Sequence, residues 1–490
     1  MIVMKFGGSS VADAERIRHV AEIVKARLDR KPVLVLSAMG DTTDHLLEAA
    51  EEAYRKGIVS ISPVEELHLK TIEDLKLPPE AGKEIALLFG ELKSLLSGIS
   101  LIRELTPRTR DYLVSFGERL SVRIAAAYLK SIGIRAGAYD AWELGFISDS
   151  NFTQAELIRE SWNLIPGKII PLSEEGLVPV VTGFIARDPN GNITTLGRGG
   201  SDLSATMIAA SCKAEEAQVW KDVDGILTAD PRIVKEAKPV ETVTYEEAAE
   251  LAYFGAQVLH PRAMQPCIKS GTPVLVKNSY NPLAPGTRIV PSFEKKTLPV
   301  RAITSRGNVT LVDIVSTRML GQYGFLSGVF AAFARHQFSV DMVATSEVSV
   351  SLTLDAVYDL EELRKDLSQI ASVDIRTGKA IVTIIGNVKR SSEILARAFR
   401  TCQLLGVTVQ MVSQGASKVN ISFIVDDSEA PEVVRALHMD FFDILEIPGK
   451  PGAAGTAKPG RAAEAVAKAS AKAPAKASAE VFQNVKGGKA

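Results

Sequence analysis

Short runs of β-branched and apolar residues alternate with helical patterns over the first 300 residues, and this alternation constrains the fold more than any other feature. The runs that are typical of buried strands lie at residues 2–6, 33–36, 178–182, 217–220 and 273–276. Helical patterns separate them, for example at residues 11–28 and 203–211. Strands of this kind with intervening helices are typical of a mainly parallel sheet that helices cover on both faces. We therefore predict an α/β domain over residues 1–300, with a helical insertion at residues 57–110, where strand signals are few.

The chain changes character after residue 300, where two similar segments follow each other about 70 residues apart. Residues 348–355 (VSVSLTLD) align with residues 419–426 (VNISFIVD). Each unit has a β-α-β-β pattern with room for a further helix and strand. We therefore predict two small α+β domains with antiparallel sheets, at residues 301–378 and 379–448.

The last segment, residues 449–490, is rich in Ala, Lys, Gly and Pro and has almost no large apolar residues. It cannot bury enough surface to offset the entropy of ordering the chain, so we expect it to be disordered. Its lysines could contact acidic surfaces, although a solvated extension without a function is the favoured interpretation.

Composition narrows the class of protein. The formal net charge of −1 gives no global basic field for nucleic acid. The three cysteines are scattered without C-x-x-C spacing, which is typical of a reducing compartment and of a chain without a disulfide framework or a zinc site. We find no signal-peptide pattern and no apolar run long enough to span a bilayer. We therefore expect a soluble cytoplasmic protein, or one of the plastid stroma if the sequence is a processed form.

The first chemically suggestive segment is KFGGSS at residues 5–10, where a predicted strand meets a predicted helix. Gly7 and Gly8 would let backbone N–H groups approach phosphate oxygens, and the helix start adds a favourable dipole. Lys5 can offer an ammonium to charge that develops on a transferred phosphoryl group, and Ser9 lies in the same turn. The alternative is a tight strand–helix turn with helix caps.

A second segment, LGRGGSD at residues 196–202, also opens a helix. Arg198 suits a bidentate contact with a carboxylate, and Ser201 supplies a hydroxyl. Asp202 could bind an ammonium or orient a reacting group. Two such cradles on one parallel sheet predict phosphate at one and a carboxylate substrate at the other, with a capped loop as the structural alternative.

Polar residues that follow other predicted strands or start a helix complete the candidate site. Thr43 ends a loop after a buried strand, where a ligand would meet the sheet. Glu118, which precedes an arginine, is interpreted functionally only together with the other motifs, since such a pair is usually a surface ion pair. Lys221 and Arg232 are candidates for nucleotide phosphates and Asp222 for the base or ribose, with a solvated loop as the alternative.

No cluster of His, Cys and carboxylate residues has metal-ligand spacing, and His260 before a proline is interpreted as a buried structural histidine. The lack of a general base is consistent with phosphorylation of a carboxylate, which has a pKa near ~4 and is already ionised at neutral pH. Such chemistry needs positioning and charge neutralisation. A magnesium ion held mainly by nucleotide phosphates and water would leave little signature in the chain, so no metal ligand is assigned.

Together these segments resemble the aspartate kinases of the amino-acid-kinase superfamily, and the resemblance extends to about residue 448. It rests on the motifs KFGGSSV at 5–11, GER at 117–119, GRGGSD at 197–202 and FGAQVLHP at 254–261. The phrases WKDVDG at 220–225 and NSYNP at 278–282 are most similar to the monofunctional, plant-like branch. The resemblance implies the amino-acid-kinase fold and the conversion of ATP and L-aspartate to ADP and 4-phospho-L-aspartate, the first step towards lysine, threonine and methionine.

The resemblance also implies roles for single residues. It makes Lys5 and Asp202 catalytic. It gives aspartate contacts to Thr43, Glu118, Arg198 and Ser201, with Arg198 on a carboxylate and Glu118 or Asp202 on the amino group. It gives nucleotide contacts to Lys5, Gly7, Gly8, Ser9, Lys221, Asp222 and Arg232. One departure is Gln257, where some members of the family carry Lys, and Lys221 is our candidate to replace that charge.

The C-terminal repeat is similar to the paired ACT domains of these kinases, which bind an amino acid, often lysine, and pair between subunits. By resemblance the effector site comprises Met319, Gly324, Phe325, Leu326, Asp341, Ser346 and Glu347. The resemblance implies feedback inhibition, with lysine as the expected effector and threonine or S-adenosylmethionine as alternatives. It also implies a homodimer or a dimer of dimers through the ACT domains, and domains that serve dimerisation alone are the structural alternative.

Two other functions stay open at this point. One is a kinase of acetylglutamate, glutamate or a nucleoside monophosphate, against which Arg198, Asp202 and the tandem repeats argue. The other is an amino-acid sensor with an inactive kinase domain, against which the intact Lys5 and Glu118 argue. Neither nucleic acid nor a membrane is an expected partner.

Overall fold

The structure is a computed structural model that describes residues 1–253, 259–292, 300–316, 323–355, 360–386, 390–414 and 419–442. The chain forms two compact units. The first contains Met1–Arg306 with the short segments Thr383–Lys389 and Gln414–Ser422. The second contains the remaining described residues. Residues 254–258, which include Gln257 of the FGAQVLHP motif, lie outside the described residues, and so does the predicted disordered tail at 449–490.

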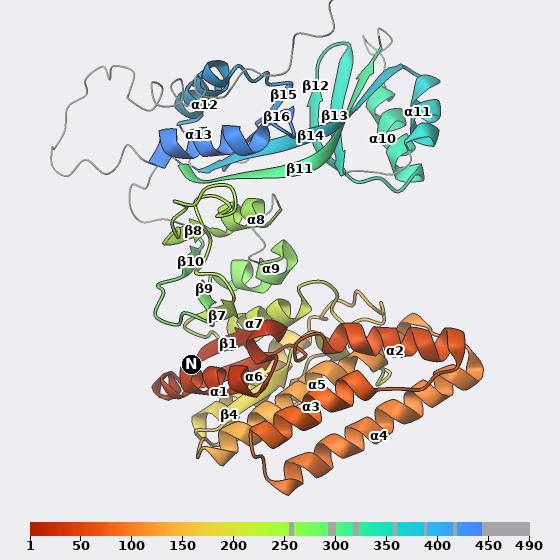
Figure 1. The fold of residues 1–490 in the computed structure, drawn as a ribbon, viewed down its shortest axis with the longest axis vertical. Helices are drawn as coiled ribbons and strands as arrows, with labels where there is room; N and C mark the ends of the chain where they lie inside the picture. Colours follow the sequence, from red (N-terminus) through yellow and green to blue (C-terminus); the bar gives the residue numbers. More distant parts are fainter. Residues whose placement is uncertain are drawn as a thin grey trace, which may run out of the picture. The chain divides into compact units, whose positions relative to one another are not determined.

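The first unit is built on an eight-stranded sheet with the order β3-β4-β2-β1-β7-β9-β10-β8 (Figure 1). Its strands are β1 (Ile2–Phe6), β2 (Pro32–Leu36), β3 (Ala136–Tyr139), β4 (Val178–Thr182), β7 (Ala217–Lys221), β8 (Thr242–Thr244), β9 (Val274–Asn278) and β10 (Thr287–Val290). Neighbouring strands are parallel except β9 and β10, which are antiparallel. The predicted mainly parallel sheet is therefore confirmed. The sequence prediction lacked β3, β8 and β10, which are short.

Helices cover both faces of this sheet. They are α1 (Ala14–Lys25), α2 (Thr42–Lys56), α3 (Ser62–Asp74), α4 (Pro79–Ile102), α5 (Pro107–Ser131), α6 (Ser161–Glu174), α7 (Gly200–Ser211), α8 (Tyr245–Tyr253) and α9 (Pro261–Ser270). On β1, Met4 and Phe6 belong to a core with residues of α1, α2, α4 and α5. Val3, on the opposite face, belongs to a core with residues of α6, α7 and α9. Full burial of one large apolar side chain contributes about 1.5–3 kcal/mol to the stability of the fold. Apolar residues are therefore favoured on both faces of the sheet, which explains the continuous apolar runs in the sequence.

Helix α4 corrects one sequence expectation. It is 24 residues long and, by length and composition alone, apolar enough to cross a membrane. One face of it, including Leu92 and Leu96, is buried in the core, and the helix packs against α2 and α5. The expectation that no apolar stretch approached this length was wrong, because the helix interleaves glycine and serine with its leucines.

Helix α5 carries much of the candidate site, and its start is fixed locally. Thr106 is the N-cap, and its hydroxyl accepts a hydrogen bond from the backbone N–H of Thr109 at 3.2 Å. Pro107 occupies the first helical position, where its missing N–H costs nothing. Helix α9 starts in the same way at His260, whose Nδ1 accepts from the backbone N–H of Arg262 at 3.2 Å. His260 is exposed, so its interpretation as a buried histidine was wrong.

A six-stranded sheet with the order β12-β13-β11-β14-β16-β15 lies mainly in the second unit. The strands are β11 (Val300–Val315), β12 (Val340–Thr345), β13 (Ser349–Asp355), β14 (Ser372–Gly386), β15 (Met411–Ser413) and β16 (Asn420–Asp426). The helices are α10 (Phe325–Arg335), α11 (Glu361–Ser368), α12 (Ser391–Leu405) and α13 (Ala430–Phe442). The chain order is β11-α10-β12-β13-α11 and then β14-α12-β15-β16-α13, which confirms the predicted internal repeat. The two halves meet where β11 neighbours β14.

Candidate active site

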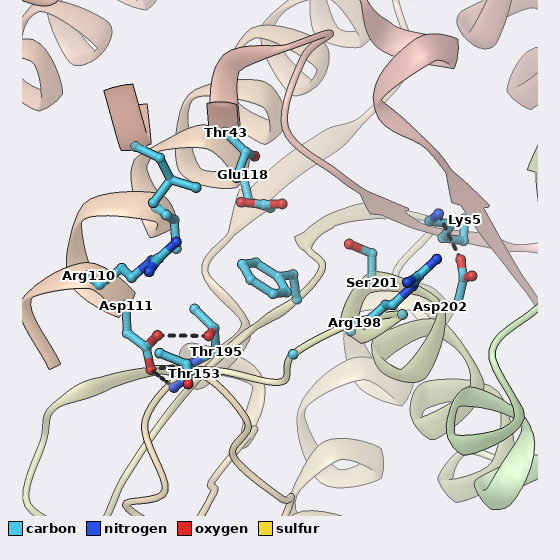
Figure 2. Close-up of a pocket in the computed structure, with 16 residues that line it drawn as sticks. Lys5, Thr43, Arg110, Asp111, Glu118, Thr153, Thr195, Arg198, Ser201 and Asp202 are labelled. Carbon is cyan, nitrogen blue, oxygen red and sulfur yellow. Dashed lines mark hydrogen bonds and ion pairs between the residues drawn. The ribbon is translucent and has the colours of Figure 1, made fainter. Parts of the chain in front are cut away.

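The candidate site lies where the carboxyl ends of the central parallel strands meet, because parallel strands bring the loops that follow them to one edge. A cavity of about 550 Å³ opens there (Figure 2). Six residues that the sequence predicted line this cavity: Lys5, Thr43, Glu118, Arg198, Ser201 and Asp202. Sequence reasoning missed others that also line it, among them Arg110, Asp111, Thr153, Phe184 and Thr195.

The glycine turn after β1 is held against two other loops. The 3-10 helix η1 (Gly8–Val11) starts there, and a Cβ on Gly8 would lie 2.8 Å from the Ala38 carbonyl oxygen, so no larger residue fits. The Ser10 hydroxyl lies 2.9 Å from that of Ser279, which follows β9. The turn thus joins the ends of β1, β2 and β9 and exposes Ser9 to solvent.

Two lysines flank the buried Asp202, and of these two Lys5 lines the cavity whereas Lys221 does not. Lys5 Nζ lies 2.7 Å from Asp202 Oδ1, and both side chains are nearly inaccessible. Lys221 Nζ lies 4.0 Å from Asp202 Oδ2. Burial lowers the pKa of Lys221, and the charge of Lys5 lowers it further, while Asp202 opposes the shift. The ammonium of Lys221 is therefore held less firmly than that of Lys5. An incoming anion would favour the charged form of Lys221.

Glu118 is a buried carboxylate on α5 with a hydrogen bond to the loop after β2. Its Oε1 accepts from the backbone N–H of Ala38 at 3.1 Å. Its Oε2 is buried and has no hydrogen-bond partner among the described residues. Burial raises the pKa of Glu118 to about 8, against the opposing effects of the Ala38 N–H and the Lys5 charge. A buried carboxylate with an unused oxygen at a cavity wall is suited to bind a cation from a ligand.

Arg198, Ser201 and Asp202 come from the loop and first turn of α7, and in the close-up view they gather with Lys5 on one side of the cavity. Gly199, with φ of +77°, turns the chain into the helix. Arg198 is exposed, so its guanidinium is available to an anionic ligand. Thr43, in the first turn of α2, stands on the wall with Glu118 (Figure 2). The sequence motifs thus converge on one cavity although they lie far apart in the chain.

Asp111 is the most strongly bound of the residues that the sequence analysis missed. Its Oδ2 accepts from the backbone N–H groups of Thr153 and Thr195, each at 2.9 Å, and its Oδ1 accepts from the Thr195 hydroxyl at 2.8 Å (Figure 2). Burial raises the pKa of Asp111, and these hydrogen bonds oppose that shift. Asp111 ties α5, which carries Glu118, to the chain that leads from β6 (Ile193–Thr195) into the Arg198 loop.

The remaining predicted nucleotide residues lie outside the lining of this cavity. Asp222 is exposed and follows Lys221 at the end of β7. The Arg232 side chain is exposed, and its guanidinium pairs with Asp230 at 2.6 Å. No group of three or more His, Cys, Asp or Glu side chains in the described part of the chain is placed to hold a metal ion.

The predicted effector residues lie in the second unit. Gly324, with φ of +87°, is the N-cap of α10, which begins with Phe325 and Leu326. Asp341 lies on β12, and Ser346 and Glu347 form the turn into β13. The Ser346 hydroxyl lies 2.6 Å from that of Ser349. Met319 lies outside the described residues, and the effector role of the others stays a prediction.

Comparison with known families and proteins agrees with this geometry. The model of the Amino acid kinase family matches residues 1–278, and that of the ACT domain matches residues 382–441. Aspartokinase 1, chloroplastic, from Arabidopsis thaliana is 50% identical over 458 residues, which are 90% of this chain and 80% of that protein.

Two crystal structures of Escherichia coli aspartokinase III are also similar. The structure in complex with lysine and aspartate (T-state) has a TM-score of 0.77 and 34% identity, and the match covers 90% of this chain and 99% of that one. The structure in complex with aspartate and ADP (R-state) has a TM-score of 0.75 and 33% identity over 90% of this chain and 100% of that one.

Proposed function

The chain belongs to the aspartokinases of the amino acid kinase family, and from this we propose that it transfers the γ-phosphoryl group of ATP to the side-chain carboxylate of L-aspartate. The products are ADP and 4-phospho-L-aspartate. The observation that carries the proposal is the buried Glu118, whose free oxygen lies on the wall of the same cavity as Arg198 and Lys5. These groups provide places for an ammonium, a carboxylate and a phosphoryl group.

The substrate is oriented by charge. The ammonium of aspartate binds Glu118, and its α-carboxylate takes the exposed guanidinium of Arg198, which suits bidentate contact. The hydroxyls of Thr43 and Ser201 line the same cavity and donate hydrogen bonds to the substrate. Because its ammonium and α-carboxylate are both fixed, aspartate directs its side-chain carboxylate towards Lys5.

The chemical step needs charge neutralisation more than proton transfer. The attacking carboxylate has an ordinary pKa near ~4 and is ionised at neutral pH. Its oxygen attacks the γ-phosphorus, and the bond to the bridging oxygen of ADP breaks. Lys5, held at 2.7 Å from Asp202, stabilises the charge on the equatorial oxygens, and Lys221 joins it from β7. Asp202 keeps the two ammonium groups together against their mutual repulsion.

The glycine turn holds the nucleotide phosphates through the backbone N–H groups of Gly7, Gly8 and Ser9. Mg²⁺ fits this site as an ion bound mainly by those phosphates and by water, where it would offset their charge, because the described residues offer no ligand cluster. Asp222 and Arg232 are proposed nucleotide contacts that follow the end of β7.

Regulation and assembly complete the proposal. Feedback inhibition by lysine through the second unit is supported by the lysine and aspartate complex of the E. coli enzyme and by the ACT match. Pairing of two chains through these domains, and the cytoplasm as the compartment, are proposed as well. The plastid stroma is the alternative that the name of the Arabidopsis relative supports. The proposed division is a catalytic domain at 1–300, ACT domains at 301–378 and 379–448, and a disordered tail at 449–490.

The test is a hydroxamate assay, which traps an acyl phosphate, with L-aspartate, L-glutamate and N-acetyl-L-glutamate at equal concentrations. We expect product from L-aspartate only, and none from the Lys5→Ala variant when its circular dichroism shows a folded protein. An enzyme that used N-acetyl-L-glutamate as well as L-aspartate would refute the substrate. An unchanged rate for Lys5→Ala would refute the role of that lysine.

A further inference from the structure

A second cavity, of about 530 Å³, lies in the first unit beside the β5–β6 hairpin. Its walls come from α4, α5, the 3-10 helix η3 (Ala141–Leu144) and the hairpin formed by β5 (Ile185–Arg187) and β6. It shares no lining residue with the aspartate cavity. Nothing in the proposed reaction uses it.

The two cavities lie on different faces of α5. Asp111 and Glu118 are seven residues apart, two helical turns, and face the aspartate cavity. Arg108, Tyr112 and Arg119 face the second cavity. Consecutive residues Glu118 and Arg119 therefore point to different cavities, and one helix separates them.

Positive charge dominates the second cavity. Arg108, Arg119 and Arg187 line it, and Glu91 is its single carboxylate. Glu91 is already engaged, since one oxygen accepts from the Tyr112 hydroxyl and the other from Arg119 Nη2 at 3.1 Å. The lining therefore has more guanidinium charge than its own carboxylate can neutralise.

Two of the guanidinium groups also keep unused donors. Nε and Nη1 of Arg119 are buried without a hydrogen-bond partner among the described residues, and so is Nε of Arg187. Asp140 lies 3.6 Å from Arg119 Nε, but Arg123 already binds both of its oxygens, at 2.9 and 3.2 Å. Unpaired buried donors on a charged group destabilise the fold. An acceptor that bears negative charge would relieve this cost.

An aromatic ring orients one of the three arginines that line the cavity. The guanidinium of Arg187 stacks over the ring of Trp142, 4.5 Å from its centroid, which fixes its plane. A preoriented fork of this kind matches the two oxygens of a carboxylate or a phosphate. The volume exceeds that of a single inorganic ion and suits a small organic molecule.

We propose that this second cavity binds a small, multiply charged oxyanion, held by Arg187, Arg119 and Arg108. The ligand carries carboxylate or phosphate groups, whose chemistry the three guanidinium groups share. The site is separate from the aspartate cavity and belongs to the first unit alone, so it does not depend on the proposed effector site of the second unit.

The experiment measures anion binding with the active site filled. The full chain is saturated with ADP and L-aspartate, at constant ionic strength and without Mg²⁺, and titrated with citrate or with pyrophosphate by calorimetry. Tryptophan fluorescence, to which Trp142 at the site contributes with two other tryptophans, gives a second readout. The variants are Arg187→Gln and Arg108→Gln, and the matched control is Arg55→Gln, an exposed arginine on α2 that pairs with Glu51.

We expect saturable binding of at least one anion to the wild-type chain and about tenfold or weaker binding to Arg187→Gln, because a charge-assisted contact is lost. Arg108→Gln should weaken it less, and Arg55→Gln should match the wild type. Binding of citrate alone identifies a carboxylate ligand, and binding of pyrophosphate alone a phosphate ligand. Absence of saturable binding by either anion overturns the proposal. So does an affinity that neither Arg187→Gln nor Arg108→Gln changes, and Arg108 is exposed, so its variant folds if the first does not.

Discussion

Replacement of Glu118 by Gln tests the aspartate site most directly. Gln keeps the shape of the side chain and an oxygen that can accept from the Ala38 N–H, which lies 3.1 Å from Oε1 in the wild type. It removes only the negative charge next to the free Oε2. If that oxygen binds the substrate ammonium, the variant loses a buried ion pair and little else.

The expected loss is large. Removal of one partner from a buried, hydrogen-bonded charge pair costs about 2–5 kcal/mol, which corresponds to an increase of 30-fold or more in the KM for aspartate at pH 8.5, where Glu118 is mostly ionised. The KM for ATP should stay within about twofold, since Glu118 lies on the aspartate wall of the cavity. The two KM values thus separate a substrate contact from a general distortion of the site.

The pH dependence gives an independent check. Burial raises the pKa of Glu118 to about 8 in the free enzyme, so only the ionised fraction of molecules binds the ammonium. The wild-type KM for aspartate should therefore fall by roughly tenfold between pH 7 and pH 8.5, as that fraction grows. The KM of Glu118→Gln should be flat over this range because Gln does not titrate.

The free energy of unfolding should fall as the pH rises, whereas the affinity for aspartate should grow. The folded-state pKa of about 8 lies above the ordinary value of 4.5, so the stability present below pH 4.5 is lost as the pH rises through 8. Ionisation of Glu118 thus costs the wild-type fold up to about 5 kcal/mol at high pH. The Glu118→Gln variant does not have this cost because Gln does not ionise. Urea denaturation at pH 8.5 should therefore show the variant to be at least as stable as the wild type.

The assay is ADP release coupled to NADH oxidation, with aspartate and ATP varied separately at pH 7 and pH 8.5. An aspartate KM that Glu118→Gln leaves unchanged would refute the ammonium contact. A wild-type KM that did not change between the two pH values would refute the raised pKa as its cause.

Three further variants probe the residues around Glu118. Asp111→Asn should lower the free energy of unfolding by about 1–3 kcal/mol in urea denaturation, because an NH2 group replaces one carboxylate oxygen and at least one of the three donors loses its acceptor; equal stability would contradict this. Lys221→Met should raise the KM for ATP several-fold and leave that for aspartate unchanged in the coupled assay, since Lys221 is a proposed nucleotide contact; the reverse pattern would make it a substrate contact. Asp341→Ala should abolish inhibition by lysine without a change in the uninhibited rate, and an unshifted inhibition curve would leave the second unit without that effector contact.

The sequence predicted the parts of the site that follow strands and glycine turns. Lys5 lies one residue before the end of a fully buried strand, and Arg198 lies in a glycine-rich loop before a helix, so each had a local signal. The convergence of these loops followed from the parallel order of the strands. The antiparallel β10 and the β5–β6 hairpin were missed, since each is four residues or shorter and has no clear alternation.

Asp111 shows why the rest could not be predicted. Its partners are 42 and 84 residues away along the chain, and nothing near it marks a buried acceptor. The nucleotide contact predicted for Arg232 stays a prediction. Its position beside a polar turn was compatible with a phosphate contact, yet its nearest charge is Asp230, two residues before it.

The structure also bears on which lysine carries more of the phosphoryl charge. Lys5 is paired with Asp202 at 2.7 Å and is part of the site before any ligand arrives. Lys221 lies 4.0 Å from the same carboxylate, and burial and the neighbouring ammonium both lower its pKa. An ATP phosphate would oppose both effects, because it adds negative charge where the two ammonium groups repel each other. In the proposed mechanism Lys5 is therefore the permanent counter-ion of the site, whereas the charge on Lys221 grows as the nucleotide binds.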